Sequence, residues 1–512
     1  MRTAKGALTG AAPAGTATLS TATLSTATLG AATLGEALDN APLSAFHRRA
    51  ALISGVGFFT DAYDLFVIST VATIVSVRWH LTTSQTSWVT GSAILGAFVG
   101  AIAFGRLADI VGRKRIYVTV AAVMIAGALT SSLAPNFMAL TAARFLLGLG
   151  IGGDYPVSAV LMSEYANRDD RGRLVGLVFS MQALGLVVGP LVALGLLESH
   201  VGDELTWRLL LALGALPAAG VVYLRSKMPE SPRFQASVRG RARQAAAELA
   251  AFSGGVVPAV FAPAQPAGRR GPGRRRLSAV VRDRRTLRLL IGTAGSWFVL
   301  DYAYYGNTLS LPVILKNVDP GADLAAKLIL SLAMFVVFAV PGYAFAIWWM
   351  DRIGHRRLQL VGFAVLASAF LLLAVVPVLT ASVGTFIAVF GLSYFFVEFG
   401  PNTTTFVLPS EVFGVSFRTT GHGISAGVGK LGAFVGVFLV PALETRFGLR
   451  PMLAMAAISA VVGIALTRLL PEAARRGLED VAGEDDAAVC IVIGDEAEGS
   501  PGRSVLVDVE PG

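Results

Sequence analysis

The chain has 512 residues, of which 54% are hydrophobic and only 15% are charged. Soluble globular domains carry about 25% charged residues, so this composition excludes an ordinary soluble enzyme and predicts a polytopic membrane protein. A single cysteine, Cys490, excludes a disulfide framework and a zinc-cysteine or iron–sulfur cluster. The five histidines lack the spacing of a metal pair, so we expect neither a metal nor a cofactor.

The formal net charge of +9 is concentrated in one stretch. Between Lys227 and Arg285 basic residues exceed acidic ones by ten, which leaves the rest of the chain near −1. A basic loop between apolar segments is typical of the cytoplasmic face of a membrane protein. We prefer this interpretation to a nucleic-acid site.

The two ends of the chain differ from the rest. Residues 1–43 include the repeats TATLS-TATLS-TATLG-AATLG, which are too polar to span a bilayer and lack the flanks of a signal peptide. We predict a disordered tail there. Residues 473–512 are acidic, with Glu484 and Asp495 among their charges, and we predict a solvated tail.

From Leu52 onward come apolar runs of about 20 residues, the length that crosses a bilayer. The twelve predicted spans are 51–77, 88–108, 115–134, 137–166, 173–197, 207–226, 287–315, 325–350, 357–378, 382–409, 419–443 and 451–470. Spans 1, 4, 7 and 10 contain acids or prolines, so we expect their mean hydropathy to be low for transmembrane helices. The loops at 106–115, 168–173 and 352–357 are rich in arginine, which predicts that they, the central loop 227–286 and both termini are cytoplasmic.

An internal repeat divides the membrane part into halves, 44–226 and 287–472. The matching residues are Asp109 with Asp351, Pro229 with Pro471, and Glu164 with Glu411. The first two pairs are 242 positions apart and the third is 247 apart, in one order along the chain. Parallel six-helix halves are the layout of major facilitator transporters. The predicted fold class is therefore an all-α polytopic membrane protein with twelve transmembrane helices.

A glycine-rich stretch, Gly148-Leu-Gly-Ile-Gly-Gly153, satisfies the dinucleotide fingerprint G-x-G-x-x-G. That fingerprint needs a preceding strand and a soluble helix, whereas this stretch lies in an apolar span. Gly148 and Gly152 are four residues apart, so they form a smooth helical face that another helix can approach closely. We therefore expect helix packing here and no nucleotide.

Charged residues inside the spans are the main candidates for function, because each costs at least ~2.5–3.5 kcal/mol in the bilayer and so indicates a cavity or a partner. They are Asp61, Asp64, Arg144, Asp154, Asp301, Glu398 and Lys430. Trp297, Asp301 and Tyr305 share one helical face at i, i+4 and i+8, which favours a polar ligand over an interhelical hydrogen-bond cluster. Apart from Lys327 at the edge of span 325–350, Lys430 is the one lysine inside a predicted span, and its alternative role is a structural pair with an acid such as Asp301.

A second set of charged residues lies near span ends or in the repeated loop motifs. They are Asp109, Arg113, Arg144, Glu164, Asp351, Glu411 and Arg418. For this set we prefer gating or structural ion pairs to a ligand site.

Several motifs resemble the phosphate:proton symporters of the major facilitator superfamily, over about residues 37–475. They are Phe58-Phe-Thr-Asp-Ala-Tyr-Asp-Leu-Phe66, Gly150-Ile-Gly-Gly-Asp-Tyr-Pro156, Trp297-x3-Asp301-x3-Tyr305, Gly400-Pro-Asn-Thr-Thr-Thr405 and Gly421-His-Gly-Ile-Ser425 with Lys430. The phosphate ligands that the resemblance implies near the midplane are Tyr155, Gln182, Trp297, Asp301, Tyr305, Asn402 and Lys430. It also implies that protons move through Asp61 or Asp64 and through Asp154.

The chemistry of these residues agrees with that implication. Phenol, amide, indole and ammonium groups are suitable donors to phosphate oxygens. An acid such as Asp301 fits an anion site only if a proton is shared, which would select phosphate over sulfate. One departure is Glu398, four residues before Asn402, where the family commonly has a neutral residue; another is the missing proline after Phe413. An extra carboxylate would alter proton stoichiometry or substrate.

The leading hypothesis is proton-coupled uptake of inorganic phosphate by alternating access. We expect a monomer in the cell membrane, surrounded by the lipid bilayer. The alternatives are a major facilitator symporter for another anion, such as an organic acid, and a phosphate sensor without turnover. An enzyme is not expected, because the sequence has no nucleophile–base pair or metal cluster.

Overall fold

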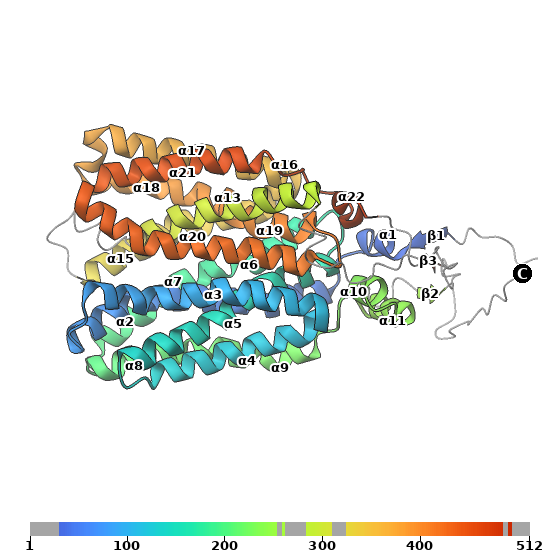
Figure 1. Ribbon diagram of the computed structural model, residues 1–512, viewed down its shortest axis with the longest axis horizontal. Helices are drawn as coiled ribbons and strands as arrows, with labels where there is room; N and C mark the ends of the chain where they lie inside the picture. Colours follow the sequence, from blue (N-terminus) through green and yellow to red (C-terminus); the bar gives the residue numbers. More distant parts are fainter. Residues whose placement is uncertain (1–29, 253–258, 262–282, 310–323, 485–489, 494–512) are drawn as a thin grey trace, which may run out of the picture.

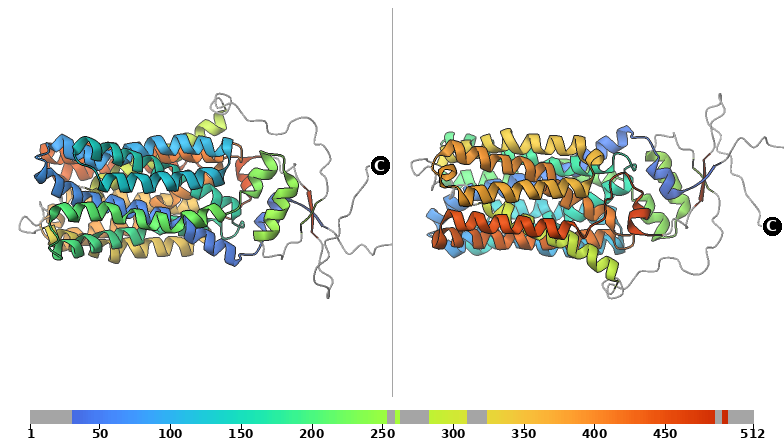
Figure 2. Two further views of the ribbon diagram at one scale, coloured as in Figure 1. Left: turned by 90° about the horizontal axis from the view of Figure 1, so that it is seen from below. Right: turned by 90° about the horizontal axis from the view of Figure 1, so that it is seen from above.

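The computed structural model describes residues 30–252, 259–261, 283–309, 324–484 and 490–493. Long helices run side by side along one axis, and four short helices gather at one end of the bundle (Figures 1 and 2). We call this end the capped end. Its helices are α1 (Leu34–Asp39), α10 (Pro232–Ser237), α11 (Ala242–Phe252) and α22 (Leu478–Ala482).

The first half consists of six membrane-length segments. They are α2 (Ala45–Arg78), α3 (Thr83–Val111), α4 (Arg113–Ser132), α5 (Phe137–Tyr165), α6 (Arg171–Ser180) with α7 (Gln182–Glu198), and α8 (Asp203–Leu213) with α9 (Ala215–Lys227). Side-chain caps start two of them: the Thr82 hydroxyl accepts the Gln85 N–H before α3, and the Asn136 side chain accepts the Ala139 N–H before α5.

The second half repeats this plan with more irregular helices. Its elements are α13 (Arg284–Leu309), α15 (Leu324–Met334), η1 (Phe335–Ala339), α16 (Val340–Ile353), α17 (His355–Val375), η2 (Pro377–Thr380), α18 (Val383–Val397), η3 (Glu398–Asn402), α19 (Thr403–Val412), α20 (Arg418–Phe447) and α21 (Leu449–Thr467). Gly112 in the first half and Gly354 in the second make equivalent turns with φ of 117° and 102°, a region that favours glycine. The internal repeat is thus visible in the backbone.

The predicted transmembrane fold is confirmed. Eleven segments in the described part of the chain are long and apolar enough to cross a membrane. The predicted seventh span corresponds to α13, which does not meet that criterion because Asp301 and several tyrosines interrupt its apolar sequence. It nevertheless runs along the bundle beside α20 and α21 (Figure 1). The described residues therefore contain twelve long helical segments, and the membrane part of the protein is all-α.

Close helix packing at the glycine-rich stretch of α5 is also confirmed. A Cβ atom added to Gly148 would lie 2.0 Å from the backbone oxygen of Ala93 on α3, and one added to Gly152 would lie 2.0 Å from that of Ala97. The two helices therefore touch through their backbones, which no larger residue would allow.

The structure of the capped end differs from the prediction for the two tails of the chain. The predicted disordered tail 1–43 includes α1, where Leu38 is buried, and the predicted solvated tail 473–512 includes α22, where Leu478 is buried. These segments are ordered because their apolar residues pack under the bundle, and they are too short for a periodic sequence signal. Residues 1–29, 485–489 and 494–512, which include Asp495 of the predicted acidic tail, lie outside the described residues.

The predicted central loop 227–286 also contains structure, since α10 and α11 lie within it. Three short strands complete the capped end: β1 (Gly30–Thr33), β2 (Ala259–Phe261) and β3 (Cys490–Ile493). They form an antiparallel sheet in the order β1-β3-β2. Segments from both ends of the chain and from its middle therefore meet at one place.

Candidate functional site

Polar side chains from both halves meet near the middle of their helices. From the first half come Asp61 on α2, Tyr155 on α5 and Gln182 at the start of α7, and all three are buried. From the second half come Asp301 and Tyr305 on α13, Tyr343 on α16, Glu398 and Asn402 on η3, and Lys430 on α20, all of them buried. We call these nine residues the central cluster.

Lys430 occupies one side of the central cluster. Its Nζ donates to Tyr305 Oη at 2.7 Å and to Asp301 Oδ2 at 3.3 Å. It also lies 4.6 Å from the centroid of the Tyr155 ring, a distance at which a cation is attracted to an aromatic face. The side chain is 4% exposed. The structure therefore contains the Lys430–Asp301 pair that the sequence left as an alternative, at the place where the ligand was predicted.

A chain of hydrogen bonds crosses between the halves. Tyr155 Oη donates to Asp61 Oδ2 at 2.5 Å, and Gln182 Nε2 donates to Tyr155 Oη at 3.1 Å. On the other side of the chain, Tyr343 Oη donates to Gln182 Oε1 at 3.4 Å and accepts from Asn402 Nδ2 at 3.1 Å. Two predicted ligands of the first half are thus linked to one of the second half.

Asn402 extends this chain to Glu398, whose Oε2 lies 2.6 Å from Asn402 Nδ2. Glu398 is fully buried and makes no ion pair within the described residues. Tyr343, which bridges Gln182 and Asn402, was missed by sequence reasoning. A tyrosine inside an apolar span is common, so nothing in the sequence distinguishes it.

The central cluster is closed in this conformation. The cavity between Asp61, Asp64, Tyr305 and Lys430 has a volume of about 10 Å³. A site needs roughly 10–15 Å³ of such volume to hold one water molecule, so no polyatomic anion fits without movement of the helices. The predicted ligands Tyr155, Gln182, Asp301, Tyr305, Asn402 and Lys430 are brought together in a site that is closed in this conformation.

An aromatic wall completes the site. Trp297 is 1% exposed, and its ring centroid lies 6.0 Å from that of Tyr155 and 5.7 Å from that of His422. A Cβ added to Gly429 would lie 2.5 Å from Trp297 Cδ1, so glycine on α20 leaves the room that this indole occupies. The indole therefore lies beside the central cluster, with one ring contact to a predicted ligand.

The two acids of the first span have different surroundings. Asp64 is held by Arg144 on α5, whose Nη2 donates to Oδ2 at 2.7 Å and whose Nη1 contacts the other oxygen. Asp61 has a phenol rather than a guanidinium as its closest partner and forms no ion pair among the described residues. Arg144 was predicted to form a structural pair, and its partner is one of the two acids that we considered for proton transfer.

Asp154 lies outside the central cluster, although its neighbour Tyr155 is part of it. Arg225 on α9 donates to both carboxylate oxygens of Asp154, at 2.7 and 2.9 Å, and Ser158 donates to Oδ1 at 3.0 Å. Arg225 also stacks 4.2 Å over the ring of Tyr117. Sequence reasoning missed Arg225, because an arginine in the last turn of a predicted span is usually a residue that flanks the membrane at its surface.

At the capped end, buried ion pairs join the two halves. Arg113 Nη2 lies 3.1 Å from Asp109 Oδ1 and 3.4 Å from Glu164 Oε1, and Arg418 Nη1 lies 3.1 Å from the same Glu164 oxygen. Asp109 accepts from the N–H of Thr420 at 2.7 Å. Because Arg418 and Thr420 belong to the second half, these contacts hold the capped end closed.

The repeat places a matching set in the second half. His355 stands where Arg113 stands in the first half, and its ring nitrogens lie 3.1 Å from Asp351 Oδ1 and 2.8 Å from Glu411 Oε2. Asp351 accepts from the N–H groups of Gly172 and Arg173 in the first half, at 3.0 and 2.7 Å. The seven residues predicted for gating or structure therefore all lie in side-chain pairs, six of them at the capped end, and all but the partly exposed Asp351 are buried.

The short helices add a second layer of pairs at the capped end. Asp39 on α1 lies 2.7 Å from both Arg171 and Arg233, and Arg233 lies 3.2 Å from Glu479 on α22. Arg171 is the repeat counterpart of Arg418. Among the described residues, no group of three or more potential ligands is placed to hold a metal ion.

Comparison with known proteins agrees with this architecture. The family model described as sugar (and other) transporter matches residues 50–484. Low affinity inorganic phosphate transporter 4 of Medicago truncatula is 36% identical over 502 residues, covering 88% of this chain and 94% of the relative. Putative inorganic phosphate transporter 1-13 of Oryza sativa subsp. japonica is 37% identical over 483 residues, covering 88% and 93%. These relatives are transporters, not enzymes.

Solved structures show the same fold. The major facilitator superfamily proton:xylose symporter XylE, bound to 6-bromo-6-deoxy-D-glucose, matches with a TM-score of 0.73 at 18% identity, covering 86% of this chain and 99% of XylE. The partially occluded inward open form of XylE from E. coli matches with a TM-score of 0.63, covering 84% and 100%. The chain therefore belongs to the sugar (and other) transporter family of the major facilitator superfamily, in the branch that holds the inorganic phosphate transporters.

Proposed function

We propose that this protein takes up inorganic phosphate together with protons, by alternating access around the central cluster. The observation that carries the proposal is the buried Lys430–Asp301 pair of the second half, with Tyr305 bonded to the same ammonium and Tyr155 of the first half facing it. An ammonium in a dry site is a strong partner for an oxyanion. The named relatives, which are inorganic phosphate transporters, support the choice of anion.

The same pair supplies a reason for proton coupling. In the closed site Lys430 is engaged by Asp301, so an arriving anion competes with a carboxylate for one ammonium. Protonation of Asp301 removes that competitor and leaves a carboxyl O–H that can donate to a phosphate oxygen. Proton binding and phosphate binding then favour each other, which is the thermodynamic requirement for symport.

Asp61 is the proton carrier that we prefer on the first half. It is bonded to Tyr155, a proposed phosphate ligand, whereas Asp64 and Asp154 are each held by an arginine. An acid without a cationic partner gains and loses a proton with less disruption than one in a buried ion pair. Tyr155 transmits the change to the phosphate site through one hydrogen bond.

We also propose the orientation in the membrane and the assembly. The arginine-rich turns around Arg113 and Arg356 lie at the capped end, so the positive-inside rule places this end, with both termini, in the cytoplasm of a cell membrane. The interface between the two halves lies within one chain, and all the proposed ligands come from it. A monomer is therefore sufficient for transport.

Phosphate uptake into proteoliposomes tests the proposal. Uptake should rise when an inward proton gradient is imposed and should collapse with a protonophore. The variant Lys430→Met keeps the stem but loses the charge-assisted contacts, which are worth about 1.5–3 kcal/mol, so phosphate binding should weaken about 10- to 100-fold. Lys227→Met, which changes a lysine whose Nζ lies 5.3 Å from the Tyr223 ring, is the matched control.

Three results would contradict the proposal. Uptake that follows a sodium gradient and ignores protons would exclude proton coupling. Complete inhibition by an organic acid that is itself transported faster than phosphate would favour the other anion. Tight phosphate binding without flux in sealed liposomes would indicate a sensor.

A further inference from the structure

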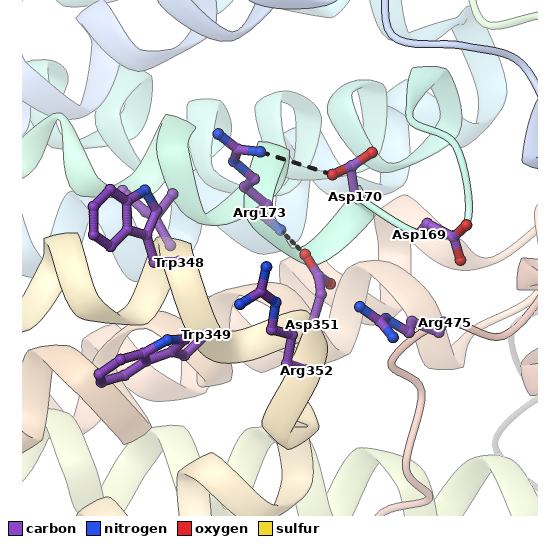
Figure 3. A pocket seen from close by; sticks show the side chains of 9 residues that line it. Asp169, Asp170, Arg173, Trp348, Trp349, Asp351, Arg352 and Arg475 are labelled. Atoms are coloured by element: carbon purple, nitrogen blue, oxygen red, sulfur yellow. Dashed lines mark hydrogen bonds and ion pairs between the residues drawn. The ribbon is translucent and has the colours of Figure 1, made fainter.

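A second charged cavity lies at the capped end, away from the central cluster. Its volume is about 370 Å³, within the range of about 300–1,000 Å³ typical of small-molecule sites. It opens between the start of α6 in the first half and the end of α16 in the second (Figure 3). Its lining contains two tryptophans, three arginines and three aspartates: Trp348, Trp349, Arg173, Arg352, Arg475, Asp169, Asp170 and Asp351.

The charges of this cavity leave two arginines without a partner. Asp351 already accepts the N–H groups of Gly172 and Arg173 and contacts His355. The Asp170 carboxylate at the rim lies 3.9 Å from the Arg173 guanidinium, and that of Asp169 lies at the same distance from Arg168. Arg352 and Arg475 are exposed and form no ion pair with any described residue. The cavity therefore offers two free guanidinium groups to an anion.

The two tryptophans indicate where this anion comes from. Trp348 is 72% exposed and Trp349 is 40% exposed, in the last turns of a helix apolar enough to cross a membrane. Exposed tryptophans near the end of a span lie at the level of the lipid headgroups. Arg352 follows within one turn, so its guanidinium is placed at the phosphate layer of the bilayer.

We propose that this cavity binds the phosphodiester of an anionic phospholipid, with Arg352 and Arg475 on the phosphate and Trp348 against the lipid glycerol and upper acyl chain. Guanidinium groups bind phosphate oxygens in a bidentate manner, which supplies both affinity and orientation. The ammonium of a zwitterionic headgroup would lie beside these two unpaired arginines, so an anionic headgroup fits them better.

The place of the cavity gives the bound lipid a role in transport. Arg173 belongs to the first half and Arg352 to the second, and the Asp351 contacts with Gly172 and Arg173 hold these halves together at the cavity wall. The lining of this cavity comes from both halves, so the cavity is complete only in the conformation closed at the capped end. A lipid bound there therefore raises the population of that conformation. The binding site itself does not depend on which solute is transported.

Lipid binding to purified full-length protein tests this site. The probe is dioleoyl phosphatidylglycerol added to protein in neutral detergent, with retained lipid counted by native mass spectrometry. We expect the double variant Arg352→Gln/Arg475→Gln to bind this lipid at least tenfold more weakly than the wild type. Arg357→Gln, which changes an exposed arginine of the same end outside the cavity, is the control and should bind normally.

Two further comparisons decide the source of the phosphate group and guard against misfolding. Phosphatidylethanolamine should bind at least tenfold more weakly than phosphatidylglycerol, and inorganic phosphate, which we propose binds at the central cluster, should not displace bound phosphatidylglycerol. Equal binding of phosphatidylethanolamine, or displacement by inorganic phosphate, would overturn the assignment to an anionic lipid. Brominated phosphatidylglycerol should quench the tryptophan fluorescence of the wild type more than that of the variant Trp348→Phe, which keeps every arginine. Equal quenching of these two proteins, or undiminished lipid retention by the double arginine variant, would overturn the site.

Discussion

Replacement of Asp154 by asparagine removes one charge from a buried ion pair. The Asp154 carboxylate receives two hydrogen bonds from Arg225, at 2.7 and 2.9 Å, and the two side chains are 4% and 1% exposed. The asparagine amide keeps the shape but accepts through one oxygen and presents N–H groups to a guanidinium. Arg225 then remains charged in a dry site without a countercharge.

The expected cost follows from that geometry. Breaking a buried pair by neutralising one partner destabilises a protein by about 3–5 kcal/mol, whereas removing both charges is often close to neutral. The stack of Arg225 on Tyr117 survives the substitution, so we expect the lower part of that range for Asp154→Asn. The double variant Asp154→Asn/Arg225→Gln should regain at least half of the loss.

The assay is a double-mutant cycle on the free energy of unfolding in mixed detergent micelles, with proton-driven phosphate uptake measured on the same preparations. Asp203→Asn, a substitution of an exposed acid, is the control for loss of one negative charge. Our reasoning fails if Asp154→Asn is as stable as the wild type yet loses accumulation. That outcome would return Asp154 to the proton pathway that the family resemblance implied.

Three other substitutions separate the remaining roles. Asp61→Asn should retain exchange of phosphate for phosphate but lose accumulation against a gradient, and unimpaired accumulation would exclude Asp61 as a carrier. Glu398→Gln should lower the number of protons moved per phosphate, measured from the gradient that just stops net flux; an unchanged ratio would make Glu398 structural. On α11, burial and the nearby Glu230 raise the pKa of Glu248 from 4.5 to about 7. Packing of α11 should therefore be strongest below pH 4.5 and weaken as the pH rises through about 7, and amide exchange corrected for intrinsic rates should show that Glu248→Gln abolishes this dependence.

The fold and every member of the central cluster except Tyr343 could be predicted from the sequence. An apolar run of bilayer length must form a helix in lipid, because only a helix satisfies all its backbone hydrogen bonds within one segment. Composition and spacing therefore determine the helices with little help from tertiary contacts. The sequence repeat at a separation of 242 residues predicted two equivalent halves. The matching glycines Gly112 and Gly354 have the same backbone conformation, which agrees with that prediction. Asp301 and Lys430 stood out because charge inside a span is costly and therefore rare, and Tyr305 stood out because it shares a helical face with Asp301.

Which acid pairs with which base was decided by the tertiary structure alone. In the sequence, each of the three acids is an aspartate within an apolar helix, so nothing distinguishes them. In the structure, α5 brings Arg144 to Asp64 and α9 brings Arg225 to Asp154, whereas Asp61 accepts a hydrogen bond from the phenol of Tyr155. Tyr343 joins the hydrogen-bond chain only because α16 packs against η3. Helix spacing fixes which residues share a face of one helix, whereas the partner across an interface depends on how helices distant in sequence are rotated and packed, and that information is not local.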